Sequence, residues 1–256
     1  DAYSSANEYL GYYDAESCYT YNDNPAETPA TGKTKADYKR FDRSGPATNR
    51  QCANAFSGNF LNWASNSAID MLRLALSGGD RYIDESNLTI LQRAVLPNGD
   101  PACFWNSPYF FPAKQLPKDG GGTGAYWGAV PASMKTQANG SSIWVANTLN
   151  GIYFGTSNTG GCGNVGAYTL GSAGAADAMG PKTGLNSDGF FYSRVQVCKA
   201  NGNVLEDVRD YGLCKQYPNG NYKPTGVIQK YADQIRLAAF GYLMDQTASY
   251  SSGRYG

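Results

Sequence analysis

The sequence predicts an α/β or α+β fold in which helices pack on a sheet around one hydrophobic core. The first observation behind this prediction is an almost wholly apolar helical pattern within residues 57–84, and the second is a nearly continuous apolar run at 235–245. The third is the length of 256 residues, enough to bury about 70–75% of the unfolded surface. A buried helix beside a buried strand implies a helix-on-sheet core.

Residues 1–55 show little apolar periodicity and are predicted to form a tyrosine-rich irregular arm that wraps the surface. The turn-rich part of this arm supplies four oxygen-bearing side chains: Asn22, Asp23, Asn24 and Glu27. The run lacks the spacing and the late bidentate glutamate of a calcium-binding loop. A calcium site here is therefore a minor alternative.

Residues 59–76 are predicted to form one long helix that is buried on most sides, because apolar residues recur at helical spacing and leave little polar face. Ser57 or Asn59 can cap its start. The glycine pair at 78–79 can adopt the left-handed conformation that ends a helix. A second, short helix is predicted over residues 85–94, before a proline stops it.

Residues 97–190 are predicted to form a long, ordered insertion of loops and short strands. This block holds 18 of the 31 glycines and 12 of the 34 aromatic residues, but only eight charged residues. Low charge with many aromatic rings argues against disorder. Residues 142–146 and 151–156 are a candidate hairpin, and the glycines at 120–124 lack the motif of a phosphate-binding loop.

Residues 56–96 and 191–256 are predicted to supply the helix and sheet elements of the core. The pattern is β-like from residue 190 to 198, and 224–233 is predicted to be a short helix leading into 235–245, a strand covered on both faces. Three side chains of this short helix are predicted to face inward: Val227, Ile228 and Tyr231.

The cysteines indicate disulfides and an oxidising compartment, because they are even in number, widely spaced and without a C-x-x-C pair. The six candidates are Cys18, Cys52, Cys103, Cys162, Cys198 and Cys214. Six cysteines allow 15 connectivities. Sequential pairing is favoured because each pair then stays within one compositional block. Buried free thiols are the alternative.

Composition excludes several functional classes. Lys plus Arg equals Asp plus Glu at 21 each, so nucleic acid is not an expected partner. The chain has no histidine, which removes the commonest general base and the histidine-containing zinc sites. No run reaches the roughly 20 apolar residues of a membrane span. The expectation is a non-enzymatic protein with no membrane span.

Two acidic clusters keep one enzymatic alternative open. They are Asp80 with Asp84 and Glu85, and Glu206 with Asp207 and Asp210. A carboxylate pair flanking a cleft could cleave glycosides, which makes a secreted carbohydrate-binding or glycoside-cleaving module the runner-up. Both clusters lie in expected turns beside arginines, so solvated surface groups are the favoured interpretation.

Aromatic side chains of the insertion are the candidate ligand contacts, since they lie among Gly, Ser and Asn as in adaptable binding loops. Tyr and Trp offer large rigid area with one polar group. The candidates are Trp105, Tyr109, Tyr126, Trp127, Trp144 and Tyr153. For most such rings, burial in a satellite core under long loops is the favoured alternative.

Three segments, residues 9–22, 57–84 and 195–245, resemble the N-terminal half of the PilC/PilY family, the tip-associated adhesins and assembly factors of bacterial type IV pili. The most specific signals are the G-N-F-L-N-W-A helix start with its G-G-x-R end, and the C-K-x-Y…K-P-x-G run followed by Q-K-Y. These segments cover somewhat less than half of the chain.

The resemblance implies a von Willebrand A-like core, incomplete here, and a C-terminal β-propeller elsewhere in the polypeptide, so the chain is expected to be a fragment. It implies an exported protein of the periplasm, outer membrane or cell surface, located at the pilus tip, with roles in attachment and pilus assembly. The implied partners are minor pilins, a host-cell or abiotic surface, and the propeller. A module that only assembles with other pilus subunits is a third possibility.

The metal site of von Willebrand A-like domains does not carry over. Their D-x-S-x-S motif gathers hard oxygens for Mg²⁺ or Ca²⁺. The nearest match here, residues 84–88, has Leu88 in place of the second serine and follows the helix rather than preceding it. No cofactor or metal ligand is therefore predicted, and calcium is left to the full-length protein.

Overall fold

The structure is a computed structural model that describes most of the N-terminal part of the chain and several later segments. The described residues are 3–94, 113–116, 128–148, 150–155, 189–201, 204–205, 212–234, Arg236 and Ala238. None of the described helices has the length and apolar character needed to cross a membrane.

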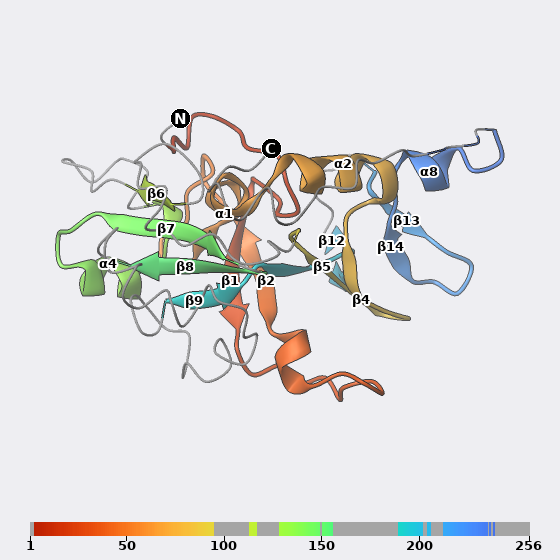
Figure 1. Ribbon diagram of the computed structural model, residues 1–256, viewed down its shortest axis with the longest axis horizontal. Helices are drawn as coiled ribbons and strands as arrows, with labels where there is room; N and C mark the ends of the chain where they lie inside the picture. The colour runs from red at the N-terminus through yellow and green to blue at the C-terminus, as the bar shows by residue number, and fades with distance from the viewer. Residues whose placement is uncertain are drawn as a thin grey trace, which may run out of the picture.

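A six-stranded sheet forms the centre of the described structure (Figure 1). Its order is β3 (Phe56–Ser57), β1 (Ser17–Asn22), β2 (Arg40–Pro46), β10 (Arg194–Val197), β5 (Leu88–Gln92) and β4 (Arg81–Glu85). Only β10 with β2 pairs in parallel among these strands, through Val195 opposite Phe41. The fold is therefore mixed α/β with a mainly antiparallel sheet.

A second sheet is an antiparallel meander in the order β6–β7–β8–β9. Its strands are β6 (Ala113–Leu116), β7 (Ile143–Thr148), β8 (Gly151–Gly155) and β9 (Phe190–Tyr192), with helix α4 (Ala132–Ala138) before β7. The predicted hairpin and the β-like segment from residue 190 are confirmed. The small hairpins are β11 (Ala200–Asn201) with β12 (Val204–Leu205), and β13 (Cys214–Gln216) with β14 (Tyr222–Pro224).

The prediction of an irregular surface arm for residues 1–55 needs correction. This region contributes strands β1 and β2 to the main sheet, and the 3₁₀ helix η1 (Lys35–Tyr38) lies between them. Tyr13 and Tyr38 are among the largest fully buried side chains. Tyrosine has an apolar ring and a single polar atom, so it can fill a core once its hydroxyl finds a partner. Tyr19 does so by accepting a hydrogen bond from the Asp14 backbone N–H at 2.8 Å.

The prediction of a single long helix is also wrong, since the chain forms two helices, α1 (Gly58–Ser65) and α2 (Ala68–Ser77). Ser57 caps α1, as predicted, and all eight α1 residues are buried. The break occurs because Asn66 is extended and Ser67 starts a new helix in a capping box with Asp70. Gly78 then ends α2 with φ of 82°, as predicted.

The predicted helix over residues 85–94 is wrong, because this segment joins the hairpin of β4 and β5. All five residues of β5 are buried. β5 lies between β10 and β4 inside the sheet, where apolar and β-branched residues pack on both faces. The apolar run was long enough for a short helix, but its position between two strands of the sheet makes it a strand.

The predicted C-terminal helix is shorter than expected, and its apolar side chains point outward. Helix α8 covers Val227–Lys230, and Val227, Ile228 and Tyr231 are 39%, 41% and 45% exposed. A Cβ on Gly226 would lie 2.3 Å from the Leu76 carbonyl carbon, so the backbone before α8, rather than its side chains, packs on α2. In the predicted strand 235–245, the structure describes two residues, and both are exposed and outside any strand.

The two sheets share one hydrophobic core built largely from aromatic rings. We define the aromatic junction as Tyr21 of β1, Phe41 of β2, Phe56 of β3, Phe154 of β8 and Phe191 of β9. The rings of Phe41 and Phe191 stack at 6.0 Å between centroids, and Phe56 lies edge-on to both at 5.3 and 5.4 Å. The insertion's hairpin therefore packs directly against the central sheet.

Candidate functional site

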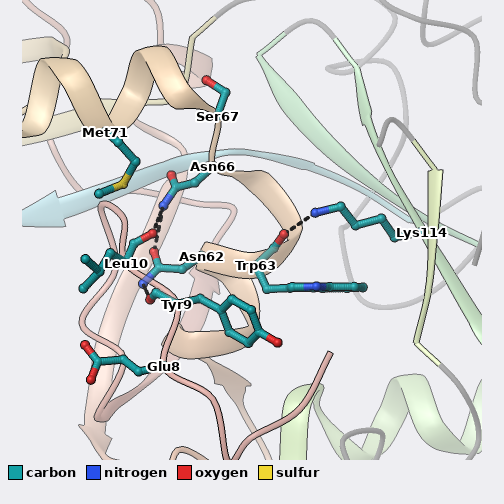
Figure 2. A pocket seen from close by; sticks show the side chains of 9 residues that line it. All are labelled: Glu8, Tyr9, Leu10, Asn62, Trp63, Asn66, Ser67, Met71 and Lys114. Carbon is teal, nitrogen blue, oxygen red and sulfur yellow. Dashed lines mark hydrogen bonds between the residues drawn. The ribbon is translucent and has the colours of Figure 1, made fainter. Parts of the chain in front are cut away.

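A groove of about 490 Å³ opens beside the C-terminal end of α1 (Figure 2). Its walls come from the N-terminal segment before β1, the α1–α2 junction, α2 and β6. The lining residues are Glu8, Tyr9, Leu10, Asn62, Trp63, Asn66, Ser67, Met71 and Lys114. The groove combines two opposite charges, three amide or hydroxyl groups, two aromatic rings and two aliphatic side chains.

Two asparagines of α1 hold the N-terminal segment in place. Asn59 accepts from the Tyr9 backbone N–H at 2.8 Å and donates to the Asn7 carbonyl at 2.8 Å. Asn62 accepts from the Tyr13 N–H at 3.0 Å and donates to the Tyr9 and Tyr13 carbonyls at 2.8 Å each. The side-chain amide of Asn62 is thus used for structure and not for binding.

Asn66 completes this ladder but keeps one acceptor unused. Its Nδ2 donates to the Leu10 carbonyl at 2.8 Å and to Asn62 Oδ1 at 3.3 Å, so two acceptors fix the orientation of the amide. Its Oδ1 is buried and receives no hydrogen bond. Gly11 permits this close packing, because a Cβ there would lie 1.3 Å from Asn66 Nδ2.

Lys114 of β6 links the second sheet to the end of α1. Its Nζ donates to the Trp63 carbonyl at 2.5 Å and lies 4.6 Å from the centre of the Trp63 ring. The carbonyls of the last helical turn lack partners within the helix and carry partial negative charge, which favours a cation there. Burial, with the Arg93 guanidinium nearby, lowers the pKa of the Lys114 ammonium to about 8.

We expect the wild type to become more stable relative to Lys114→Met as the pH rises from 7 to 10. The pKa of Lys114 is about 8 when folded but about 10.4 when unfolded, so the unfolded chain binds more protons in this interval. After a discount for partial exposure, the relative gain should be about 1–2 kcal/mol. Urea unfolding of both proteins at pH 7, 8.5 and 10 measures it, and parallel pH curves would contradict it.

The described residues include two of the three expected cysteine pairs. Cys18 is bonded to Cys52 and Cys198 to Cys214, with Cα–Cα distances of 5.8 and 5.5 Å. Both are pairs expected from sequential pairing. The third expected pair, Cys103 with Cys162, lies outside the described residues.

Two of the six candidate ligand-contact aromatics can be placed. Tyr153 is 4% exposed and belongs to the core, and Trp144 of β7 is half-buried. Tyr153 therefore presents no binding surface in this structure. The remaining four lie outside the described residues: Trp105, Tyr109, Tyr126 and Trp127.

In the described acidic cluster, Asp80 and Asp84 form ion pairs and Glu85 accepts a hydrogen bond. Asp80 pairs with Arg73 at 2.7 Å, and Asp84 pairs with Arg81 at 3.0 Å and Lys223 at 2.7 Å. Burial alone would raise the pKa of the Asp84 carboxyl, but hydrogen bonds from Lys223 and Arg81 outweigh it and lower that pKa. Glu85 accepts a hydrogen bond from the Tyr38 hydroxyl. The other cluster, Glu206, Asp207 and Asp210, lies outside the described residues.

The oxygen-bearing run considered for calcium also faces cationic side chains. Asp23 lies 3.2 Å from Lys39 Nζ, and Glu27 lies 2.6 Å from Arg40 Nη2. Burial opposes ionisation of Glu27, but its hydrogen bond from Arg40 prevails and lowers the pKa of the carboxyl. Across the described residues, no cluster of three or more His, Cys, Asp or Glu side chains has a geometry that could hold a metal ion.

Sequence reasoning missed the groove, although one signal was present. Asn59, Asn62 and Asn66 recur at helical spacing on an otherwise apolar pattern. Three amides at i, i+3 and i+7 lie along one helical face, where buried amides need partners. The signal thus indicated that a chain segment runs beside α1, but it did not point to Lys114, which is 48 residues further along the sequence than Asn66.

Comparison with known proteins supports the family resemblance. Residues 1–107 match the family model described as the PilY1 homolog, small alpha/beta domain. Two proteins of Xylella fastidiosa (strain Temecula1 / ATCC 700964), both named type IV pilus biogenesis factor PilY1 homolog, are 27% and 25% identical to this chain. These alignments cover 96% and 94% of the chain. The resemblance to the PilC/PilY family is confirmed, at low identity.

The chain spans less than one fifth of the length of these relatives, namely 18% and 15%. No solved structure matches it significantly.

Proposed function

We propose that this chain, related to the PilC/PilY family, is the N-terminal part of a type IV pilus tip adhesin that serves in surface or host attachment and in pilus assembly. The match of residues 1–107 to the PilY1-homolog domain carries this proposal. Two relatives named as pilus biogenesis factors, each aligned over nearly the whole chain, support a role in pilus biogenesis.

The proposed location is the cell surface at the pilus tip, reached by export through the periplasm and outer membrane. Two disulfides support an oxidising compartment. A covalently closed loop also cannot be extended by force, which suits attachment under tension.

The proposed partners are minor pilins, a host-cell or abiotic surface, and the rest of the polypeptide, including a C-terminal propeller. A von Willebrand A-like core in the full-length protein is part of the same proposal. Residues beyond the mainly antiparallel sheet described above would have to complete it.

The proposed role is non-enzymatic. The runner-up, a carbohydrate-binding or glycoside-cleaving module, would need two carboxylates free to face a substrate. Asp80 and Asp84 are instead paired with arginine and lysine side chains. No observation on the described residues favours the runner-up.

Immunogold electron microscopy tests the location. An epitope inserted after Asn219, which is exposed in the turn between β13 and β14, should leave the fold intact. Gold particles on the native strain should gather at pilus ends. Label spread along the shafts, or confined to the inner membrane, would contradict the proposed tip location.

Attachment is tested by replacing the four candidate contact aromatics that lie outside the described residues. The variant carries alanine at four positions: Trp105, Tyr109, Tyr126 and Trp127. Surface attachment should fall several-fold while pilus number per cell stays constant. Alanine at Tyr217 and Tyr231, away from the insertion, is the matched control. Equal attachment by both variants and the wild type would contradict a binding role for these rings.

A further inference from the structure

The groove beside α1 contains a half-buried cation, Lys114, which forms no ion pair with a carboxylate of the described residues. The contacts of Lys114 Nζ with described residues are the Trp63 carbonyl and ring, and the positive charge of Arg93 acts on it unfavourably. The other charge of the groove, Glu8, lies 3.8 Å from Arg50. An ammonium group that is partly removed from water and has no carboxylate partner is unfavourable, so this position favours an anionic group from outside the chain.

A second polar group of the groove wall, the Asn66 side-chain amide, has an acceptor without a hydrogen-bond donor. Asn66 Oδ1 is buried and accepts nothing, and the two acceptors at Nδ2 prevent the amide from flipping to relieve this. A buried acceptor left unpaired costs about 1–3 kcal/mol. A ligand N–H or O–H that displaces the groups covering this oxygen would recover part of that free energy.

The remaining wall distinguishes a peptide from a sugar. A sugar ring needs a free aromatic face and several unused polar groups. Trp63 is 6% exposed, and its ring packs against Lys114, Phe60 and Tyr3. The Asn62 amide is already used by the backbone. Leu10 and Met71 instead offer aliphatic surface, which suits an apolar side chain.

We propose that this groove binds a peptide that carries a carboxylate. The carboxylate pairs with Lys114, a peptide N–H donates to Asn66 Oδ1, and an adjacent apolar side chain packs on Leu10 and Met71. Leu10 is 50% exposed and forms the open edge of the groove, so an incoming chain can reach it. A terminal carboxylate and an aspartate side chain share this chemistry.

The test uses small probes on the intact chain, followed by isothermal titration calorimetry and by NMR of the Trp63 indole. N-acetyl-Leu-Leu with a free terminal carboxylate is compared with its C-terminal amide, and N-acetyl-Leu-Asp-Leu-amide offers the side-chain carboxylate. At least one acid should bind about tenfold more tightly than the neutral amide, which is the discrimination expected for a charge-assisted hydrogen bond. The stronger of the two acids identifies the source.

Variants assign the binding to the groove. Lys114→Met should abolish the preference for acid over amide. Lys114→Arg should retain it, because arginine keeps the positive charge that pairs with the carboxylate. Asn66→Leu should weaken acid and amide alike by about 3–10-fold, since both use the N–H. Lys230→Met, an exposed lysine on α8, is the matched control and should change nothing.

Three results would overturn the proposal. The first is equal affinity for the acids and the amide in the wild type. The second is an acid preference that survives in a folded Lys114→Met protein, with folding checked by circular dichroism. The third is binding of N-acetylneuraminic acid but of neither acidic peptide, which would assign the groove to acidic sugars. None of these results bears on tip location, so they are separable from a failure of the proposed function.

Discussion

Replacing Phe41 by alanine is expected to lower the free energy of unfolding by about 3–5 kcal/mol, the range for large aromatic truncations in cores. Phe41 is fully buried in β2, and its ring contacts Tyr13, Tyr21, Phe56 and Phe191 at centroid distances of 5.1 to 6.0 Å. Removal of the ring therefore leaves a cavity lined by other rings, which cannot collapse without moving both sheets.

Urea unfolding followed by circular dichroism measures this loss. Phe41→Leu keeps most of the volume and should cost clearly less. Tyr231→Ala removes a ring that is 45% exposed and should change stability by no more than about 0.5 kcal/mol. A loss below 1 kcal/mol for Phe41→Ala would mean that the aromatic junction does not support the fold.

A double-mutant cycle extends this prediction to the joint between the sheets. Phe41 belongs to the six-stranded sheet and Phe191 to the four-stranded sheet, and their rings stack. If the sheets unfold as one unit, the pair should show a coupling energy of about 0.5–1.5 kcal/mol. Strictly additive losses would indicate that the four-stranded sheet packs on the six-stranded sheet without unfolding cooperatively with it.

Local signals predicted the elements whose ends are chemically marked. Ser57 and the glycine pair at 78–79 bound the helical region as expected, because caps act within a few residues. The break at Asn66 was missed because Ser67 and Asp70 form a capping box inside an apolar pattern, and periodicity continues across it. A hydrophobic pattern reports which faces are buried, but not where hydrogen bonding restarts.

Long-range pairing was beyond the sequence. Strand β10 lies between β2 and β5, so Val195 faces Phe41 across more than 150 residues of chain. Nothing local in residues 88–92 distinguishes a strand between two neighbours from a turn of buried helix. The burial of tyrosines in the N-terminal segment is missed for the same reason, since burial of a ring depends on the sheet that packs against it.

The sequence could predict only the side of the groove that is formed by α1 and the N-terminal segment. Asn59, Asn62 and Asn66 announced a bound segment by their spacing, whereas Lys114 reaches the α1 terminus through the tertiary packing of β6. A ligand site formed between two distant segments has no sequence motif of its own. Its chemistry appears only when Lys114 and Asn66 line one cavity.

Loss of the Cys18–Cys52 disulfide is expected to destabilise the protein by about 4 kcal/mol, and loss of Cys198–Cys214 by about 3 kcal/mol. In the chain-entropy model the effect grows with the loop that is closed, and these loops span 34 and 16 residues. Paired alanine substitutions remove each bond without leaving a single reactive thiol. Thermal and urea unfolding of the two variants measure the losses.

The two bonds should also differ in what they hold. Cys18 lies in β1, inside the main sheet, and the Cys52 N–H donates to the Gly128 carbonyl at 2.9 Å, so this bond ties the sheet to the insertion. Cys214 begins the β13–β14 hairpin, which touches the sheet through Lys223 and its contact with Asp84. We therefore expect hydrogen exchange to accelerate across β1 and β2 in the first variant, but mainly in the hairpin in the second. Equal losses with the same exchange pattern would mean that both bonds act on the unfolded chain alone and that neither one organises the native sheet.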